Sequence, residues 1–244
     1  MKNIIVEGHR GYAAKYPENT MISYKAAIEL GVDAIEFDVW LTKDKVPVLI
    51  HDGNTMRTCG KDSRIQDLTF EELREFEPAY TDKFGDEFVG RGIKIPSLEE
   101  LLAYCSENHP KIILGVEIKE YTEETVDLTV ALLKKYGFFD SCYFYAFNAR
   151  IIKYLKTKYN GHTMGYPDIQ MGEFECDSYD YYVDIGLSMK FMRSELRPFY
   201  FAKGLPVHAY CADNDEDVEF CIECGADLIT ANDPVSLMKK LNRI

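Results

Sequence analysis

Short runs of β-branched and aromatic residues alternate along this chain with segments whose apolar residues recur at helical spacing. The runs predict strands at residues 3–7, 34–40, 111–119, 142–147, 163–166, 181–185, 206–211 and 227–230. Helices are predicted after most of them, including 123–136, 149–159, 215–224 and 235–241. Such alternation is typical of βαβ units on a parallel sheet, and eight strands close a TIM (β/α)8 barrel. An open dinucleotide-binding sheet is the competing topology, but no G-x-G-x-x-G follows the first strand.

One stretch departs from this pattern. After the second predicted strand a polar turn at 43–45 leads into another apolar run, 46–50, which ends in His51. The gap is too short for a parallel crossover, so we expect a hairpin that lays His51 roughly opposite Glu36. Residues 53–94 then carry many charges and glycines and one short helix at 70–76, which is typical of an insertion. We therefore expect one barrel domain over residues 1–244, with a small insertion at about 53–94 after the second strand.

Composition narrows the classes of function. The formal charge of −13 disfavours nucleic acid and a stable association with membranes, because both attract clustered Lys and Arg. No apolar run approaches the roughly 18 residues of a membrane span. The N-terminal segment reaches Glu7 too early for a signal peptide, and the seven cysteines, an odd number, are typical of reduced core thiols. These features predict a cytoplasmic protein.

Ionisable side chains stand near the carboxyl ends of the first three predicted strands, and one more follows the hairpin. They are His9, Arg10, Glu36, Asp38, Glu117, Lys119 and His51. Charged residues in apolar strands are costly unless they are paired or bind a ligand, and the carboxyl ends of barrel strands form the active face. We therefore expect these seven residues to converge on one site.

Their chemistry is complementary. Glu36 and Asp38 stand two apart, so both project from one face of a strand, and with Glu117 they form an all-oxygen site. Such a site suits one divalent cation, Mg²⁺ or Ca²⁺, better than zinc. The two histidines suit general acid and base catalysis near neutral pH, whereas Arg and Lys bind phosphate oxygens. This set of groups is typical of phosphoryl transfer.

Several ordered motifs carry a resemblance to a known family. They are His9-Arg10-Gly11, Pro17-Glu18-Asn19-Thr20, Glu36-Phe37-Asp38-Val39 with Leu41-Thr42-Lys43-Asp44, Ile50-His51-Asp52, Ile95 to Glu100 and Glu117-Ile118-Lys119. Together they resemble the glycerophosphodiester phosphodiesterase family over nearly the full length. The resemblance implies a TIM barrel that hydrolyses small glycerophosphodiesters to sn-glycerol 3-phosphate and an alcohol with a divalent cation.

The resemblance also implies roles for individual residues. Glu36, Asp38 and Glu117 would bind the metal, and Arg10 with Lys119 would contact the phosphate. His9 and His51 would form the acid–base pair. The resemblance does not say which of them acts as the acid and which as the base. Two alternatives remain: a phospholipase D-like or lysophospholipid-cleaving barrel, and a catalytically silent barrel that binds phosphodiesters. The sequence does not decide the oligomeric state, the preferred headgroup, or the choice between Mg²⁺ and Ca²⁺.

The C-terminal third differs from the family pattern. Tyr210-Cys211 stands where the family usually has Trp-Thr, and Ala146-Phe147 stands where it usually has Ser-Phe. Tyr210 is a candidate substrate-binding residue, because its ring can cover the carbon skeleton of a substrate. Packing in the core is the alternative role for Tyr210. These differences bear on substrate preference and leave the predicted metal and proton-transfer residues intact.

Overall fold

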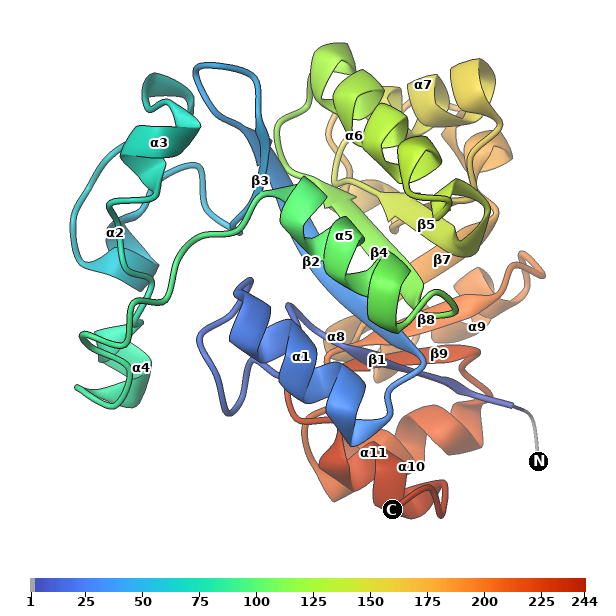
Figure 1. The fold of residues 1–244 in the computed structure, drawn as a ribbon. Coiled ribbons are helices and arrows are strands. Elements are labelled where there is room, and N and C mark those ends of the chain that lie inside the picture. The colour runs from blue at the N-terminus through green and yellow to red at the C-terminus, as the bar shows by residue number, and fades with distance from the viewer. Residues whose placement is uncertain (1–2) are drawn as a thin grey trace.

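Eight parallel strands close into a barrel in the computed structural model, which describes residues 3–244. The ring runs through β1 (Ile5–Gly8), β2 (Ala34–Leu41), β4 (Ile113–Ile118), β5 (Cys142–Tyr145), β6 (Thr163–Gly165), β7 (Asp184–Ser188), β8 (Val207–Tyr210) and β9 (Leu228–Ala231). Strand β1 pairs in parallel with both β2 and β9, which closes the ring. The predicted TIM barrel is therefore confirmed (Figure 1).

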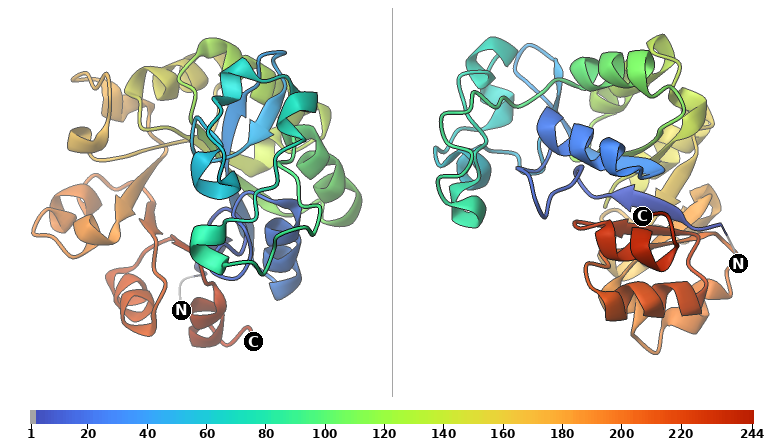
Figure 2. Two further views of the ribbon diagram at one scale, coloured as in Figure 1. Left: turned by 90° about the vertical axis from the view of Figure 1, so that its left-hand side faces the viewer. Right: turned by 60° about the horizontal axis from the view of Figure 1, so that its bottom comes forward.

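The helices surround this ring (Figures 1 and 2). The longer ones are α1 (Met21–Leu30), α5 (Leu98–Asn108), α6 (Glu123–Lys135), α7 (Ala149–Tyr159), α10 (Asp215–Cys224) and α11 (Val235–Lys240), and α8 (Met189–Met192) and α9 (Arg197–Phe201) are short. Ser97 and Glu100 form a capping box at the start of α5. Among the described residues, no helix has the length and apolar character needed to cross a bilayer.

The predicted hairpin forms outside the ring. Strand β3 (Pro47–Leu49) pairs antiparallel with β2, and Leu49 lies opposite Val39. The Ile50 amide then donates to the Asp38 carbonyl at 3.1 Å. Continued by two residues, this register brings His51 opposite Phe37, one residue from the expected partner Glu36. The hairpin therefore delivers His51 to the carboxyl end of β2.

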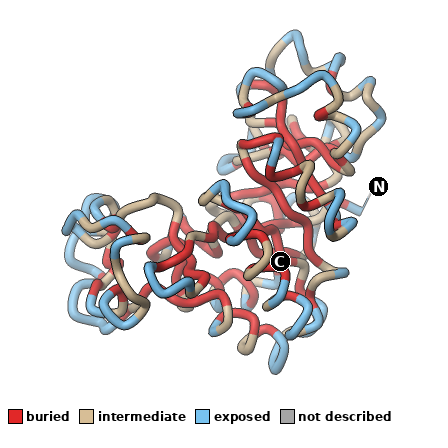
Figure 3. The backbone as a smooth tube through the Cα atoms, turned by 90° about the horizontal axis from the view of Figure 1, so that it is seen from above, coloured by how far each residue is buried: buried red, intermediate tan, exposed pale blue. Residues whose placement is uncertain are grey.

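The segment after the hairpin forms a separate lobe beside the barrel (Figures 1 and 2). It contains only short elements: α2 (Met56–Cys59), η1 (Ile65–Asp67), α3 (Phe70–Leu73) and α4 (Thr81–Phe84). It packs on a small apolar cluster of its own, formed by Val48, Ile50, Ile65, Leu73, Phe76 and Ile95. Buried residues elsewhere concentrate in the barrel strands (Figure 3). The insertion therefore adds a second, smaller core without entering the barrel.

One strand lies later in the chain than its apolar pattern predicts. Residues 181–185 were the expected strand, whereas β7 covers Asp184–Ser188. The preceding tyrosines belong instead to the turn η4 (Ser178–Tyr181), one of three further 3-10 turns with η2 (Phe139–Ser141) and η3 (Asp168–Gln170). The Tyr179 ring lies 5.0 Å from that of Phe174 and 5.4 Å from that of Tyr182. The aromatic residues that suggested a strand at 181–185 therefore pack in a turn instead, and β7 begins later, at Asp184.

Candidate active site

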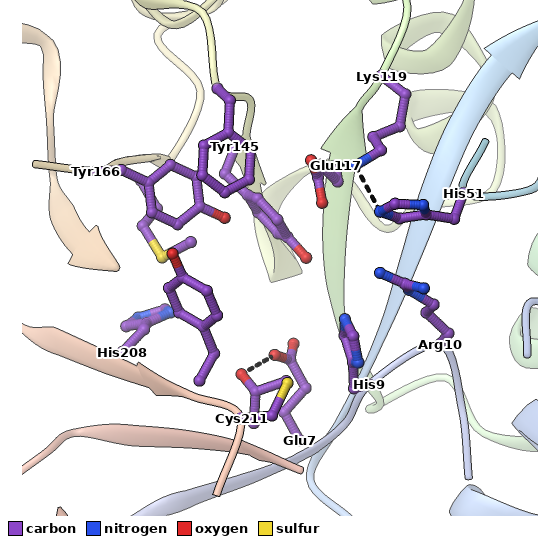
Figure 4. Close-up of a pocket in the computed structure, with 14 residues that line it drawn as sticks. Glu7, His9, Arg10, His51, Glu117, Lys119, Tyr145, Tyr166, His208 and Cys211 are labelled. Carbon is purple, nitrogen blue, oxygen red and sulfur yellow. Dashed lines mark hydrogen bonds and ion pairs between the residues drawn. The ribbon is translucent and has the colours of Figure 1, made fainter. Parts of the chain in front are cut away.

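A cavity of about 220 Å³ lies at the carboxyl end of the barrel. Six of the eight predicted site residues line it, namely His9, Arg10, His51, Glu117, Lys119 and Tyr210. The basic residues and His9 face the aromatic side chains across this space (Figure 4). The other two predicted residues, Glu36 and Asp38, lie behind the lining and are almost fully buried. The structure therefore brings all the predicted residues to one place.

The three acidic residues form a tight cluster. One carboxylate oxygen from each of Glu36, Asp38 and Glu117 lies within 4.8 Å of the others. Parallel pairing explains this convergence, because Asp38 on β2 lies beside Glu117 on β4. Among the described residues, Glu36 Oε1 and Asp38 Oδ1 are buried and have no hydrogen-bond partner. Buried, unpaired carboxylate oxygens are costly, so this donor set fits a hard divalent cation.

Burial and mutual repulsion separate the pKa values of these carboxyl groups. Burial, followed by the charge of Asp38, holds the pKa of Glu36 well above its usual value and raises that of Glu117 to about 7. Burial also acts to raise the pKa of Asp38, but Arg10 and Lys119 outweigh it and hold that pKa well below its usual value. Near neutral pH, Asp38 is therefore ionised, Glu117 is partly ionised and Glu36 keeps its proton.

Arg10 enters the site through an unusual backbone conformation. Its φ is +52°, and Gly11 follows with a φ of +85°. The turn aims the Arg10 amide at Glu36 Oε2, 2.8 Å away, and brings Nε to 3.2 Å from Asp38 Oδ2. A left-handed arginine is strained, so the surrounding contacts must hold it. The side chain is thereby fixed between the acidic cluster and the cavity.

Lys119 joins the acidic cluster to His51. Its Nζ lies 2.9 Å from Glu117 Oε1, 3.6 Å from Asp38 Oδ1 and 3.0 Å from His51 Nε2. Burial lowers the pKa of Lys119, but the Asp38 and Glu117 carboxylates outweigh burial and raise it. The charged ammonium can only donate, so His51 Nε2 accepts and Nδ1 carries the ring proton. Nδ1 then donates to Asp52 Oδ1 at 2.6 Å.

Charged residues behind His51 continue this chain of contacts. Arg57, from the insertion, contacts Asp52 Oδ2 at 2.6 Å and Glu18 Oε1 at 2.7 Å. Glu18 is buried and also accepts from Arg10 Nη1 at 2.8 Å. The hydrogen bond from His51 is the main cause of the lowered pKa of Asp52. The insertion therefore contributes to holding the two sides of the site together.

His9 occupies the opposite side of the site from His51. Its Nδ1 lies 2.7 Å from Asn232 Oδ1, and its Nε2 lies 3.8 Å from Glu36 Oε2. Burial, followed by the charge of Arg10, lowers the pKa of His9 to about 4. Its imidazole is therefore neutral near neutral pH.

Aromatic side chains form the wall opposite the basic residues. Phe147 and Tyr166 stack with ring centroids 4.0 Å apart, and Tyr210 packs edge-on against Tyr166 at 5.5 Å. Tyr210 is partly exposed and lines the cavity, so it combines the two placements considered for it, at the site and in packing. Its hydroxyl accepts from Gln170 Nε2 at 3.4 Å.

The floor of the cavity contains polar residues that no sequence motif marks. Glu7 lines the cavity and accepts hydrogen bonds from the hydroxyls of Tyr143 and Thr230. Burial, opposed by the Thr230 hydrogen bond, raises the pKa of Glu7 to about 8. Its position at the end of the first strand, two residues before His9, was a signal in the sequence. His208, Tyr145 and Tyr166 also line the cavity and had no recognised motif.

A buried carboxylate at the start of β7 contacts two histidines. Asp184 Oδ2 contacts His208 Nε2 at 3.0 Å and His162 Nε2 at 2.5 Å. Burial raises the pKa of Asp184, but the two histidine hydrogen bonds outweigh it and lower that pKa to about 2. His208 therefore connects the cavity to a buried carboxylate in the barrel wall.

Comparisons with known proteins agree with this geometry. The sequence model of the glycerophosphoryl diester phosphodiesterase family matches residues 9–175. A glycerophosphodiester phosphodiesterase of Caldanaerobacter subterraneus is 28% identical over 258 residues, covering 100% of this chain and 99% of that protein. Human glycerophosphodiester phosphodiesterase 1 is 35% identical over 55% of this chain, which matches 39% of the human protein.

A solved structure shows the same fold. A phosphodiesterase of Oleispira antarctica, in complex with the product sn-glycerol-3-phosphate, superposes with a TM-score of 0.84 at 23% identity. The similarity covers 98% of this chain and 96% of that one. It supports the barrel over nearly the whole described chain.

Proposed function

The chain belongs to the glycerophosphoryl diester phosphodiesterase family, and we propose that it hydrolyses small glycerophosphodiesters to sn-glycerol 3-phosphate and an alcohol. One observation carries this proposal. Two imidazoles, a guanidinium and an ammonium line a single cavity next to three buried carboxylates. That arrangement supplies groups for both phosphate binding and proton transfer.

The basic residues would bind the phosphodiester. Arg10 offers a planar guanidinium that can pair with phosphate oxygens, and Lys119 offers a point charge. Both are held by Asp38, so they are ordered before substrate arrives. Preorganised charges of this kind stabilise the negative charge that develops in phosphoryl transfer.

Glu36, Asp38 and Glu117 would hold one divalent cation. The buried oxygens Glu36 Oε1 and Asp38 Oδ1, which lack a hydrogen-bond partner among the described residues, fit this role. When bound, the cation neutralises charge on phosphate and attacking oxygens. Mg²⁺ and Ca²⁺ both suit an all-oxygen site.

The two histidines would transfer the protons. In the first step the glycerol 2-hydroxyl attacks phosphorus, the bond to the headgroup oxygen breaks, and a cyclic phosphate forms. One histidine, as the neutral imidazole, takes the hydroxyl proton, and the other, as the imidazolium, donates its proton to the departing alkoxide. In the second step water opens the cyclic phosphate, and the same two groups transfer protons in the reverse sense.

The cavity size favours small substrates over lysophospholipids. Its volume of about 220 Å³ is below the roughly 300–1,000 Å³ of sites for drug-sized ligands. A glycerophosphodiester without an acyl chain is therefore the better match. Parallel assays on glycerophosphocholine and on its acylated form distinguish the two, and faster cleavage of the acylated form would refute the assignment.

The main test is hydrolysis of glycerophosphocholine, followed by release of glycerol 3-phosphate. We expect turnover that EDTA abolishes and that Mg²⁺ or Ca²⁺ restores. His9→Ala and His51→Ala should each lower kcat by about 10²–10⁴-fold, the usual contribution of a general acid or base. Binding without turnover in the wild-type protein would support a silent phosphodiester-binding barrel instead.

A further inference from the structure

Two residues outside the segment matched by the family model are linked to His9 by hydrogen bonds, Asn232 directly and Asp213 through Asn232. Asp213 follows β8, Asn232 follows β9, and the match ends at residue 175. The His9 amide donates to the Ala231 carbonyl at 2.9 Å, which fixes the His9 backbone beside Asn232. The three side chains then form a continuous chain of hydrogen bonds.

We propose that Asp213 and Asn232 are positioning residues that fix the tautomer of His9, with the proton on Nδ1 and the lone pair on Nε2. No ligand is needed for this arrangement. Its consequence for turnover rests on the proposed function, whereas the tautomer itself does not.

The orientation of the Asn232 amide follows from Asp213. The carboxylate accepts from Asn232 Nδ2 at 2.7 Å and from the Asn232 backbone amide at 2.6 Å. An ionised carboxylate can only accept, so the NH₂ group of Asn232 must face Asp213. The amide oxygen Oδ1 is thereby directed away from Asp213 and toward His9.

The orientation of Asn232 in turn determines the proton on His9. Oδ1 lies 2.7 Å from His9 Nδ1 and can only accept, so Nδ1 must carry the hydrogen. In a neutral imidazole the other nitrogen then bears the lone pair. His9 Nε2 lies on the side of Glu36, which is the side of the acidic cluster. His9 is therefore presented as a proton acceptor before substrate binds.

The contacts of His9 differ from those of His51, the second histidine. His51 donates from Nδ1 directly to a carboxylate, Asp52. His9 reaches its carboxylate only through a neutral amide. A direct carboxylate stabilises an imidazolium, whereas an amide oxygen fixes the same tautomer with much less stabilisation of the charged ring. The two histidines therefore have the same tautomer, but the protonated ring of His51 is stabilised more strongly than that of His9.

The direct test is the protonation pattern of the ring. Long-range proton–nitrogen correlation spectra of ¹⁵N-labelled protein distinguish N–H from lone-pair nitrogens, and the His9→Ala spectrum assigns the signal. In the metal-free wild type we expect the proton on His9 Nδ1. In Asn232→Leu the proton should move partly or fully to Nε2. In Asp213→Ala we expect a smaller shift toward Nε2–H. Asp213 is exposed, so Asp213→Ala provides a variant expected to fold even if Asn232→Leu does not.

Turnover of glycerophosphocholine provides the second measurement. Asn232→Leu should lower kcat about 100-fold with little change in KM, because proton transfer is affected and phosphate binding is not. The exchanged pair Asp213→Asn with Asn232→Asp retains an acceptor for His9 and a donor between the two residues. It should recover kcat to within about ten-fold of wild type. Asn108→Leu, an exposed asparagine outside the cavity lining, is the control.

The outcomes separate the two proposals. Nε2–H in the wild type, an unchanged tautomer in both Asn232→Leu and Asp213→Ala, or an exchanged pair as impaired as Asn232→Leu would overturn the positioning role. Nδ1–H that Asn232→Leu removes would support the positioning role even in a wild-type protein without phosphodiesterase activity. That last result would refute only the proposed function.

Discussion

Neutralising one carboxylate of the acidic cluster should stabilise the metal-free protein and remove its response to cations. The perturbation is Glu117→Gln, which keeps the shape of the side chain and its acceptor oxygen toward Lys119. Without a cation, ionised Glu117 is buried beside Asp38, and its pKa is raised from 4.5 to about 7. At pH 6 to 8 the ionisation of Glu117 therefore opposes folding.

The pKa shift sets the size of the effect. Each pKa unit corresponds to 1.36 kcal/mol, so a rise from 4.5 to about 7 corresponds to about 3 kcal/mol. Because the folded pKa is raised, this stability is present below pH 4.5 and is lost as pH rises through about 7. In EDTA at pH 8.5 we expect Glu117→Gln to be up to about 3 kcal/mol more stable than wild type, and the difference should vanish near pH 4.

Urea denaturation in EDTA across this pH range measures the difference. Added Mg²⁺ or Ca²⁺ should stabilise wild type by about 3 kcal/mol at 100 times Kd and should leave Glu117→Gln nearly unchanged. Glu219→Gln, which removes an exposed ion pair with Lys240, should change stability by about 1 kcal/mol or less at any pH. A Glu117→Gln protein that is less stable than wild type in EDTA at pH 8.5, with the same cation response, would refute the reasoning.

Three further predictions concern other parts of the barrel. Folding lowers the pKa of Asp184 from 3.8 to about 2, so its ionisation should contribute about 2 kcal/mol to the free energy of unfolding above pH 4. That stability should be lost as pH falls toward 2. Denaturation of Asp184→Asn should therefore lack this decrease in stability at acidic pH. Arg57→Met should destabilise by about 1–3 kcal/mol, because Glu18 is buried and loses two of its hydrogen bonds; an unchanged denaturation midpoint would contradict this. Gly165→Ala should cost at least about 1–3 kcal/mol, because a Cβ would lie 2.0 Å from the Tyr182 ring, and Tyr182→Leu should recover part of the loss in thermal melts.

Much of the fold follows from local patterns in the sequence. The alternation of strands and helices predicts the barrel, and the boundaries 149–159 and 215–224 coincide with α7 and α10. The polar turn at 43–45 predicts the β2–β3 hairpin. These features depend on residues that are close along the chain, so periodicity and turn chemistry suffice to find them.

Of the candidate site, the sequence predicts only the ionisable residues that lie near the ends of predicted strands. Glu36 and Asp38 are charged residues inside an otherwise apolar strand, and that pattern indicates a ligand or ion-pair site. Asn232 lies 223 residues from His9, and its contact depends on the closure of the ring, so no local pattern contains it. Glu7 lines the cavity with His9, but no motif marks it, because a charged residue near a chain end is usually solvated.

The position of β3 has a consequence for how such a barrel can change. Strand β3 bonds to β2 outside the closed ring, and the lobe that follows has its own apolar cluster. Lengthening or replacing residues 60–94 therefore leaves the shear and tilt of the eight strands unaltered. His51 and Arg57 lie before that interval, so a replacement that keeps its apolar cluster and the Tyr80 ring against Arg57 can change the lobe without removing these site residues.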